Sequence, residues 1–154
     1  MFKHILAPVD GSLASHAGML QAIGFAKEQK AKLRFVHVLD TYFPIYDLAG
    51  DFNIAGMLDA LHDVGRKILK DAESLAGKEG VNADSVMVEA VGGRVAEFIV
   101  EQARHWPADL IVMGTHGRRG FSHFVLGSNA EAVSRMSPIP VLLVRSAQVE
   151  GGAP

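Results

Sequence analysis

The feature that most constrains this sequence is a regular alternation of short strand-like segments with longer segments of helical periodicity. The strand-like runs, rich in apolar and β-branched residues, lie at 4–9, 33–38, 86–90, 110–113 and 140–144. Apolar residues recur every three or four positions at about 15–29 and 53–78, and again from 95 and from 128. Strands that alternate with helices predict a parallel sheet with helices on both of its faces.

Consecutive parallel strands are joined by right-handed crossovers, which favours a five-stranded Rossmann-like sheet of order 3-2-1-4-5. We expect Leu20, Ile23 and Ala26 on the inward face of the first helix. A chain of 154 residues suits one domain, expected at 1–147 and followed by a loose tail at 148–154. Ligands of such sheets bind beyond the carboxyl ends of the strands, where the strand order reverses, so Asp10 and Gly114 should flank a crevice.

Composition excludes several classes of protein. The chain has no cysteine, which removes disulfide scaffolds, thiolate metal sites and cysteine nucleophiles. A net charge of -2 gives no basic footprint for nucleic acid. No apolar run approaches the roughly 20 residues of a membrane span, and the first apolar run stops at Pro8 and Asp10, too early for a signal peptide. We therefore expect a cytoplasmic protein with neither membrane nor nucleic-acid partners.

The most informative stretch is the glycine-rich segment 114–129. Its glycines permit positive φ angles and close approach of backbone amides to a ligand; they are Gly114, Gly117, Gly120 and Gly127. A helix beginning near Ser128 adds unpaired amides, and Arg118 and Arg119 add positive charge, so the segment suits phosphate. Alternatively, residues 128–131 form a capping box and the segment is a plain connector. Both interpretations stay open on the residues alone.

Spacing separates this segment from better-known nucleotide motifs. Neither G-x-x-x-x-G-K-[ST] nor G-x-G-x-x-G after a strand occurs. The pattern present is G-x-x-G, nine residues, then G-S, formed by Gly114, Gly117, Gly127 and Ser128. With this motif the sequence resembles the universal stress protein family, specifically its ATP-binding branch. The resemblance extends over nearly the whole chain and includes the segments 5–12, 36–38, 108–114 and 140–144.

This resemblance implies a binding site for ATP, with Mg²⁺. Pro8, Val9 and Asp10 would lie against the nucleoside, and Val38 would meet adenine through its backbone. The ribose and phosphates would be held by Gly114, Gly117, Arg118, Gly127 and Ser128, and the implied set also includes Met113, His116 and Asn129. Asn129 departs from the small or β-branched residue that is usual after the Gly-Ser pair.

Asp10 has two interpretations. A carboxylate facing phosphates needs a divalent cation or the ribose hydroxyls beside it, so Asp10 is a candidate contact for the Mg²⁺ of bound ATP. Alternatively, Asp10 or Ser12 caps the helix that follows. The resemblance favours the ligand role.

Three functions compete. The leading hypothesis is a small regulatory protein that binds ATP; the alternatives are a slow ATP hydrolase or phosphotransferase, and a nucleotide-free interaction module. The seven histidines do not share a zinc-ligand spacing, although His116 can contact phosphate or ribose. No G-x-S-x-G motif of a serine hydrolase occurs.

Two surface features remain. The aperiodic segment 42–48 is either a lid over the crevice or a cover for the long helix. The final strand is apolar on both faces but ends the sheet, so we expect it to pair with the same strand of a second copy. The expected homodimer strand comprises Val141, Leu142, Leu143 and Val144.

Overall fold

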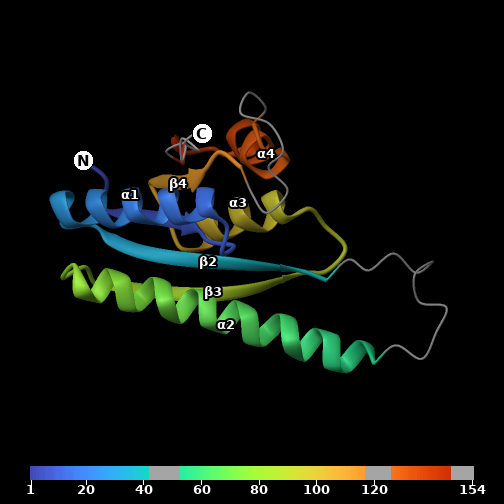
Figure 1. Cartoon of the computed structure of the whole chain (residues 1–154). Helices are drawn as coiled ribbons and strands as arrows, with labels where there is room; N and C mark the ends of the chain where they lie inside the picture. The colour runs from blue at the N-terminus through green and yellow to red at the C-terminus, as the bar shows by residue number, and fades with distance from the viewer. Residues whose placement is uncertain (42–52, 117–125, 147–154) are drawn as a thin grey trace, which may run out of the picture.

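The computed structural model describes residues 1–41, 53–116 and 126–146, and its elements alternate as the sequence predicts (Figure 1). In chain order they are β1 (His4–Pro8), α1 (Leu13–Gln29), β2 (Lys32–Asp40), α2 (Ile54–Lys78), β3 (Ala83–Ala90), α3 (Val95–His105), β4 (Leu110–Gly114), α4 (Ser128–Met136) and β5 (Val141–Val144). All strand pairs are parallel, and the order β3-β2-β1-β4-β5 confirms the prediction.

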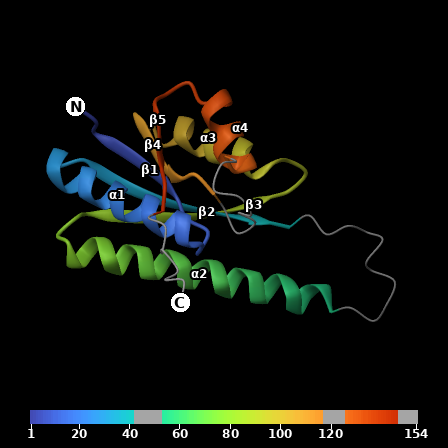
Figure 2. The same ribbon diagram turned by 45° about the horizontal axis from the view of Figure 1, so that its top comes forward.

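The helices cover the two faces of the sheet in pairs. Helices α1 and α2 pack on one face, and α3 and α4 on the other (Figure 2). Each face has its own buried apolar cluster: Phe35 and Ile5 belong to the first, and Leu6 and Ile111 to the second. The two clusters differ because successive residues of a strand point to opposite faces.

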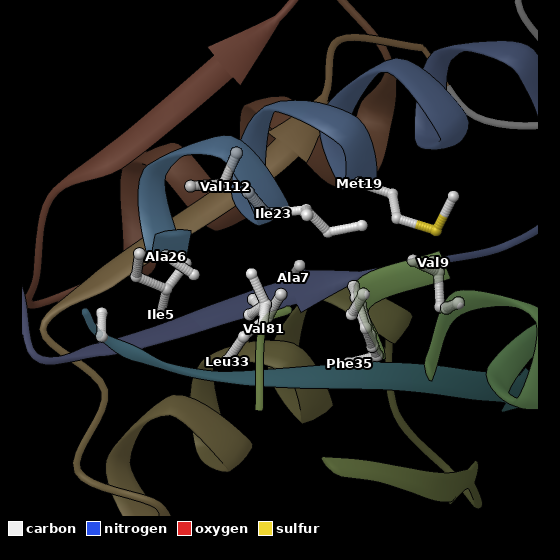
Figure 3. Packing of buried hydrophobic residues seen from close by; sticks show 14 of the residues in the cluster. Ile5, Ala7, Val9, Met19, Ile23, Ala26, Leu33, Phe35, Val81 and Val112 are labelled. Atoms are coloured by element: carbon white, nitrogen blue, oxygen red, sulfur yellow. The ribbon is translucent and has the colours of Figure 1, made fainter. Parts of the chain in front are cut away.

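Figure 3 shows the first cluster, in which Ile23 and Ala26 of α1 lie over β1 and β4. Both residues are buried, as the helical spacing predicts. Leu20, however, is 49% exposed, so its expected inward position is wrong. It lies on the flank of α1, because Met19, Ala22, Ile23 and Ala26 already fill the stripe that faces the sheet.

Helix α1 and strand β4 approach each other at the level of their backbones. A Cβ atom at Gly18 would lie 2.7 Å from the amide nitrogen of Gly114. One at Gly114 would collide with the carbonyl group of Ala14. This double glycine contact places the amino-terminal turn of α1 beside the end of β4.

Polar caps set the starts of the first two helices. Ser12 caps α1 by accepting a hydrogen bond from the amide of Ser15 (3.1 Å), so the helix begins at Leu13 rather than near residue 15. Asn53 accepts from the amide of Gly56 (2.9 Å), which makes it the cap of α2 and not its first residue. Strand β2 continues to Asp40 because it pairs with β3 along its length from Leu33.

Opposite the carboxyl ends of the strands, charge and aromatic contacts join β2, β3 and α3. Arg34 donates two hydrogen bonds of 2.6 Å to Asp84, and its guanidinium lies 4.8 Å from the ring centre of Trp106. The hydrogen bonds to Asp84 raise the pKa of Arg34 above its ordinary value. This arrangement fastens the two strands together far from the crevice.

The first turns of α2 project beyond β3, and their apolar residues Ile54 and Met57 are 43 and 42% exposed (Figure 1). Among the residues that the structure describes, no helix combines the length and apolar character needed to cross a membrane. The segment 42–48, expected as a lid or as a cover for the long helix, and the tail at 148–154 lie outside the described residues.

Candidate functional site

A cleft of about 890 Å³ opens at the carboxyl ends of β1 and β4, where the strand order reverses. Ten residues proposed from the sequence lie around this single cleft: Pro8, Val9, Asp10, Val38, Met113, Gly114, His116, Gly127, Ser128 and Asn129. The other two, Gly117 and Arg118, lie outside the described residues. The structure thus brings together residues from β1, β2, β4 and α4 that are far apart in the sequence.

The turn between β1 and α1 forms one wall of the cleft. The amide of Asp10 donates to the hydroxyl of Ser15 (2.9 Å), and Oδ1 of Asp10 accepts from the amide of Ser12 (2.8 Å). Ser12, and not Asp10, is the helix cap. Asp10 therefore stiffens the turn while its carboxylate remains part of the cleft lining.

The donor set of the cleft does not form a metal site by itself. In the described parts of the chain, no three carboxylates or imidazoles are grouped closely enough to bind a metal ion. A cation at Asp10 would need most of its oxygen ligands from elsewhere, such as the phosphates of a nucleotide.

Sequence analysis missed His37, which also lines the cleft. Its side chain is only 4% exposed, and Nδ1 lies 2.7 Å from the carbonyl oxygen of Val9. Because a carbonyl oxygen only accepts, Nδ1 carries the proton and donates. His37 thereby fixes the peptide group before Asp10. The available signal was a histidine between two apolar residues of a strand, Val36 and Val38.

Replacement of His37 by leucine should lower the free energy of unfolding by about 1–3 kcal/mol, since the buried Val9 carbonyl loses its side-chain donor. Replacement by asparagine, which retains an N–H donor, should lower it less. Urea unfolding of the two variants measures the difference. Equal losses would mean that packing of the ring, and not its hydrogen bond, stabilises the turn.

The opposite wall joins the end of β4 to the start of α4 through Thr115. Its amide donates to the carbonyl of Val144 (3.0 Å), and its carbonyl accepts from the amide of Gly127 (2.7 Å). Thr115 is itself buried. These two bonds hold Gly127 and Ser128 at the edge of the cleft.

Helix α4 has no side-chain cap. Its N-cap is Gly127, and Ser128 is the first helical residue, so the capping box considered for 128–131 does not form. Among the described residues, the Ser128 hydroxyl makes no hydrogen bond. The first amides of α4 and this hydroxyl are thus available to a ligand, and the positive end of the helix dipole favours an anion.

The two described glycines of the motif do not have unusual backbone angles. Gly127 has φ -60° and ψ 146°, which any residue adopts, and Gly114 does not have a positive φ. Neither glycine uses the positive φ that its residue type permits. Gly114 admits the backbone of α1, and Gly127 lines the cleft.

His116, which lines the cleft, has a buried polar atom. Its Nδ1 lies 2.8 Å from the hydroxyl of Thr115, and its Nε2 is buried without a hydrogen-bond partner in the described part of the chain. An unsatisfied buried nitrogen costs about 1–3 kcal/mol. A polar ligand atom or a water molecule at this position would remove that cost.

The remaining lining divides the cleft into two chemical environments. Apolar side chains line it from β2, α2 and α3, namely Val38, Leu61, Val64, Val95 and Ile99. Arg94, immediately before α3, adds a positive charge that sequence analysis missed. With the uncapped start of α4 on the other side, the cleft can hold a molecule with a flat apolar part and an anionic part.

The comparisons with known proteins agree with one another. Residues 1–145 match the model of the universal stress protein family. Universal stress protein MJ0531 of Methanocaldococcus jannaschii is 35% identical over 97% of this chain and 86% of its own.

Two solved structures extend the comparison. The crystal structure of a universal stress protein family member from Burkholderia pseudomallei is 31% identical, with a TM-score of 0.76 over 94% of this chain and 96% of its own. A universal stress protein in complex with cAMP is 26% identical, with a TM-score of 0.70 over 95% of this chain and 99% of its own. Since family model, sequence relative and solved structures each cover more than nine-tenths of its length, the chain belongs to the universal stress protein family.

Proposed function

We propose that this protein binds ATP in the cleft and acts as a dimeric regulatory protein of the stress response. The observation that carries the proposal is the uncapped start of α4, which opens into a cleft with an apolar wall. An unpaired helix start is suited to phosphate, and the apolar wall is suited to a purine. The relative solved with cAMP supports a nucleotide as the ligand class.

In this proposal Pro8, Val9, Asp10, Val38 and Met113 contact the nucleoside. The ribose and phosphates are bound by a second group, comprising Gly114, His116, Gly127, Ser128 and Asn129, together with Gly117 and Arg118 from outside the described residues. Nε2 of His116 then gains a polar partner. Mg²⁺ enters with the phosphates and contacts Asp10, because the chain's described residues do not assemble a metal site alone.

The dimer forms along β5. This strand is at the edge of the sheet and pairs with β4 through all four of its residues. Each of the four apolar side chains is partly exposed, whereas the neighbouring interior strand β4 is buried throughout. An apolar edge that is only partly covered favours pairing with a second copy about a two-fold axis.

The decisive experiment is acid extraction of the purified protein, chromatography of the released nucleotide, and calorimetric titration with ATP and Mg²⁺. We expect bound adenine nucleotide or a saturable heat. If the protein carries no bound nucleotide and has no affinity for ATP, the proposal is overturned and an interaction module is favoured. Several turnovers per minute would identify a hydrolase instead.

Valine at Gly127 should weaken ATP binding by about tenfold or more, because its branched side chain would occupy the space beside the first amides of α4. The backbone angles at Gly127 suit valine, but valine is a poorer N-cap than glycine, so the variant should fold and unfold at a slightly lower temperature than the wild type. Calorimetry and a thermal melt measure the two effects. A folded variant with wild-type affinity would remove Gly127 from the site.

A further inference from the structure

A second cavity, of about 460 Å³, lies between α1 and α2 on the face of the sheet opposite to α3 and α4. It is separate from the cleft, with which it shares only Val9 and Ser15. Figure 2 shows the two helices that form its walls running side by side over the sheet. Its volume falls within the roughly 300–1,000 Å³ of small-molecule sites.

The floor of this cavity is apolar. Val9, Met19 and Ala72 are buried at 4, 8 and 1% exposure, and Ile68 and Leu75 pack around them. Figure 3 shows Met19 and Val9 facing each other across the space between α1 and the strands. An apolar floor between two helices binds the hydrocarbon part of a ligand.

The rim carries one positive charge, that of Lys78, without an ion pair among the described residues. Asp71 is neutralised by Lys67, whose Nζ lies 2.6 Å from Oδ2 of Asp71. Lys78 and His16 also line the rim, and neither has an ion pair among the described residues. The first turn of α1, which also faces the cavity, contains no acidic residue and carries the positive end of the helix dipole. Lys78 lies in the last turn of α2, where its charge offsets the negative end of that helix.

We propose that this cavity is a second ligand site, for a small carboxylic acid with an apolar tail. The tail lies on the floor formed by Val9, Met19 and Ala72, and the carboxylate lies at the rim near Lys78. The serine hydroxyls of Ser12 and Ser74 line the same rim and add polar contacts. The two proposals share Val9, but this one does not rest on nucleotide binding, because no phosphate-binding group takes part.

Octanoate is a suitable probe, with octylamine as its cationic counterpart. In heteronuclear NMR titrations of the full chain, octanoate should shift amide signals at 12–19 and 68–78 saturably, with a dissociation constant below about 1 mM. Octylamine should bind at least about tenfold more weakly. Absence of saturable shifts with octanoate, or equal binding of the amine, would overturn the proposal.

Two surface variants locate the site. Lys78→Glu should weaken octanoate binding by about tenfold or more, whereas Lys70→Glu, the same charge change at an exposed position outside the cavity, should not. Ser74→Trp, at an exposed rim position, should block the cavity in a folded protein. Wild-type binding by both Lys78→Glu and Ser74→Trp would refute the assignment. ATP titration of each variant, run in parallel, reports separately on the cleft.

Discussion

Alanine at Gly18 is expected to lower the free energy of unfolding by about 3 kcal/mol, and alanine at Gly114 by at least as much. At Gly18 the added Cβ lies 2.7 Å from one backbone nitrogen and 2.9 Å from a carbonyl carbon, those of Gly114 and Met113. At Gly114 the obstacle is the carbonyl group of Ala14. Backbone atoms on both sides cannot turn away as a side chain would, so α1 must separate from β4.

Gly24 supplies a matched control in the same helix. A Cβ there meets no atom within 4 Å. Gly24→Ala should therefore raise the free energy of unfolding by about 0.5–1 kcal/mol through helix propensity alone. Urea unfolding of the three variants gives the comparison. Similar changes at Gly18 and Gly24 would show that the contact of α1 with β4 adapts more easily than its geometry indicates.

The fold was predictable because its main signals are local. Strand-like runs alternating with helical periodicity define the elements, and the handedness of parallel crossovers limits the strand orders. The errors in the predicted element boundaries lie where a helix cap or a neighbouring strand determines the end of an element. The start of α1 depends on the bond from Ser15 to Ser12, and the end of β2 depends on β3. Leu20 has the spacing of an inward residue, yet it lies beyond the stripe that the sheet covers.

Helical periodicity also cannot show where a sheet ends. Ile54 and Met57 continue the apolar pattern of α2, but the helix has passed β3 at these positions and both side chains are exposed. The spacing of these apolar residues correctly predicted a helix, but it did not show whether their side chains are buried. The length of β3, set elsewhere in the chain, determines which turns of α2 are covered.

The candidate site was predictable as far as its residues follow a motif. The glycine spacing and the ends of β1, β2 and β4 bring ten residues to one cleft. His37 and Arg94 were missed because their positions depend on contacts between elements: His37 reaches back to Val9, and Arg94 enters with the start of α3. The requirement for glycine at position 114 comes from α1, a contact that no spacing within the motif encodes.

Hydrogen-bond directions in β5 identify the groups available for pairing. The carbonyls of Pro140 and Val144 accept from the amides of Ile111 and Thr115, and both therefore point toward β4. Alternate residues of a strand in a parallel sheet direct their backbone groups to opposite sides. The N–H and C=O groups of Val141 and Leu143 thus point to the open edge, where a second copy of β5 would pair with them.

Leu143→Pro is expected to convert the protein from a dimer to a monomer, because it removes an N–H at the open edge without removing a bond to β4. The matched control is Leu143→Ala, which truncates the same side chain and retains the N–H, and should stay dimeric. Light scattering should give about twice 16.5 kDa for the wild type and the alanine variant, and about 16.5 kDa for the proline variant. Circular dichroism establishes that each variant is folded. A monomeric wild type would exclude pairing through this edge, and so would a folded proline variant that remains a dimer. If the proline and alanine variants both dissociate to the same extent, the side chain of Leu143, and not its N–H, forms the interface.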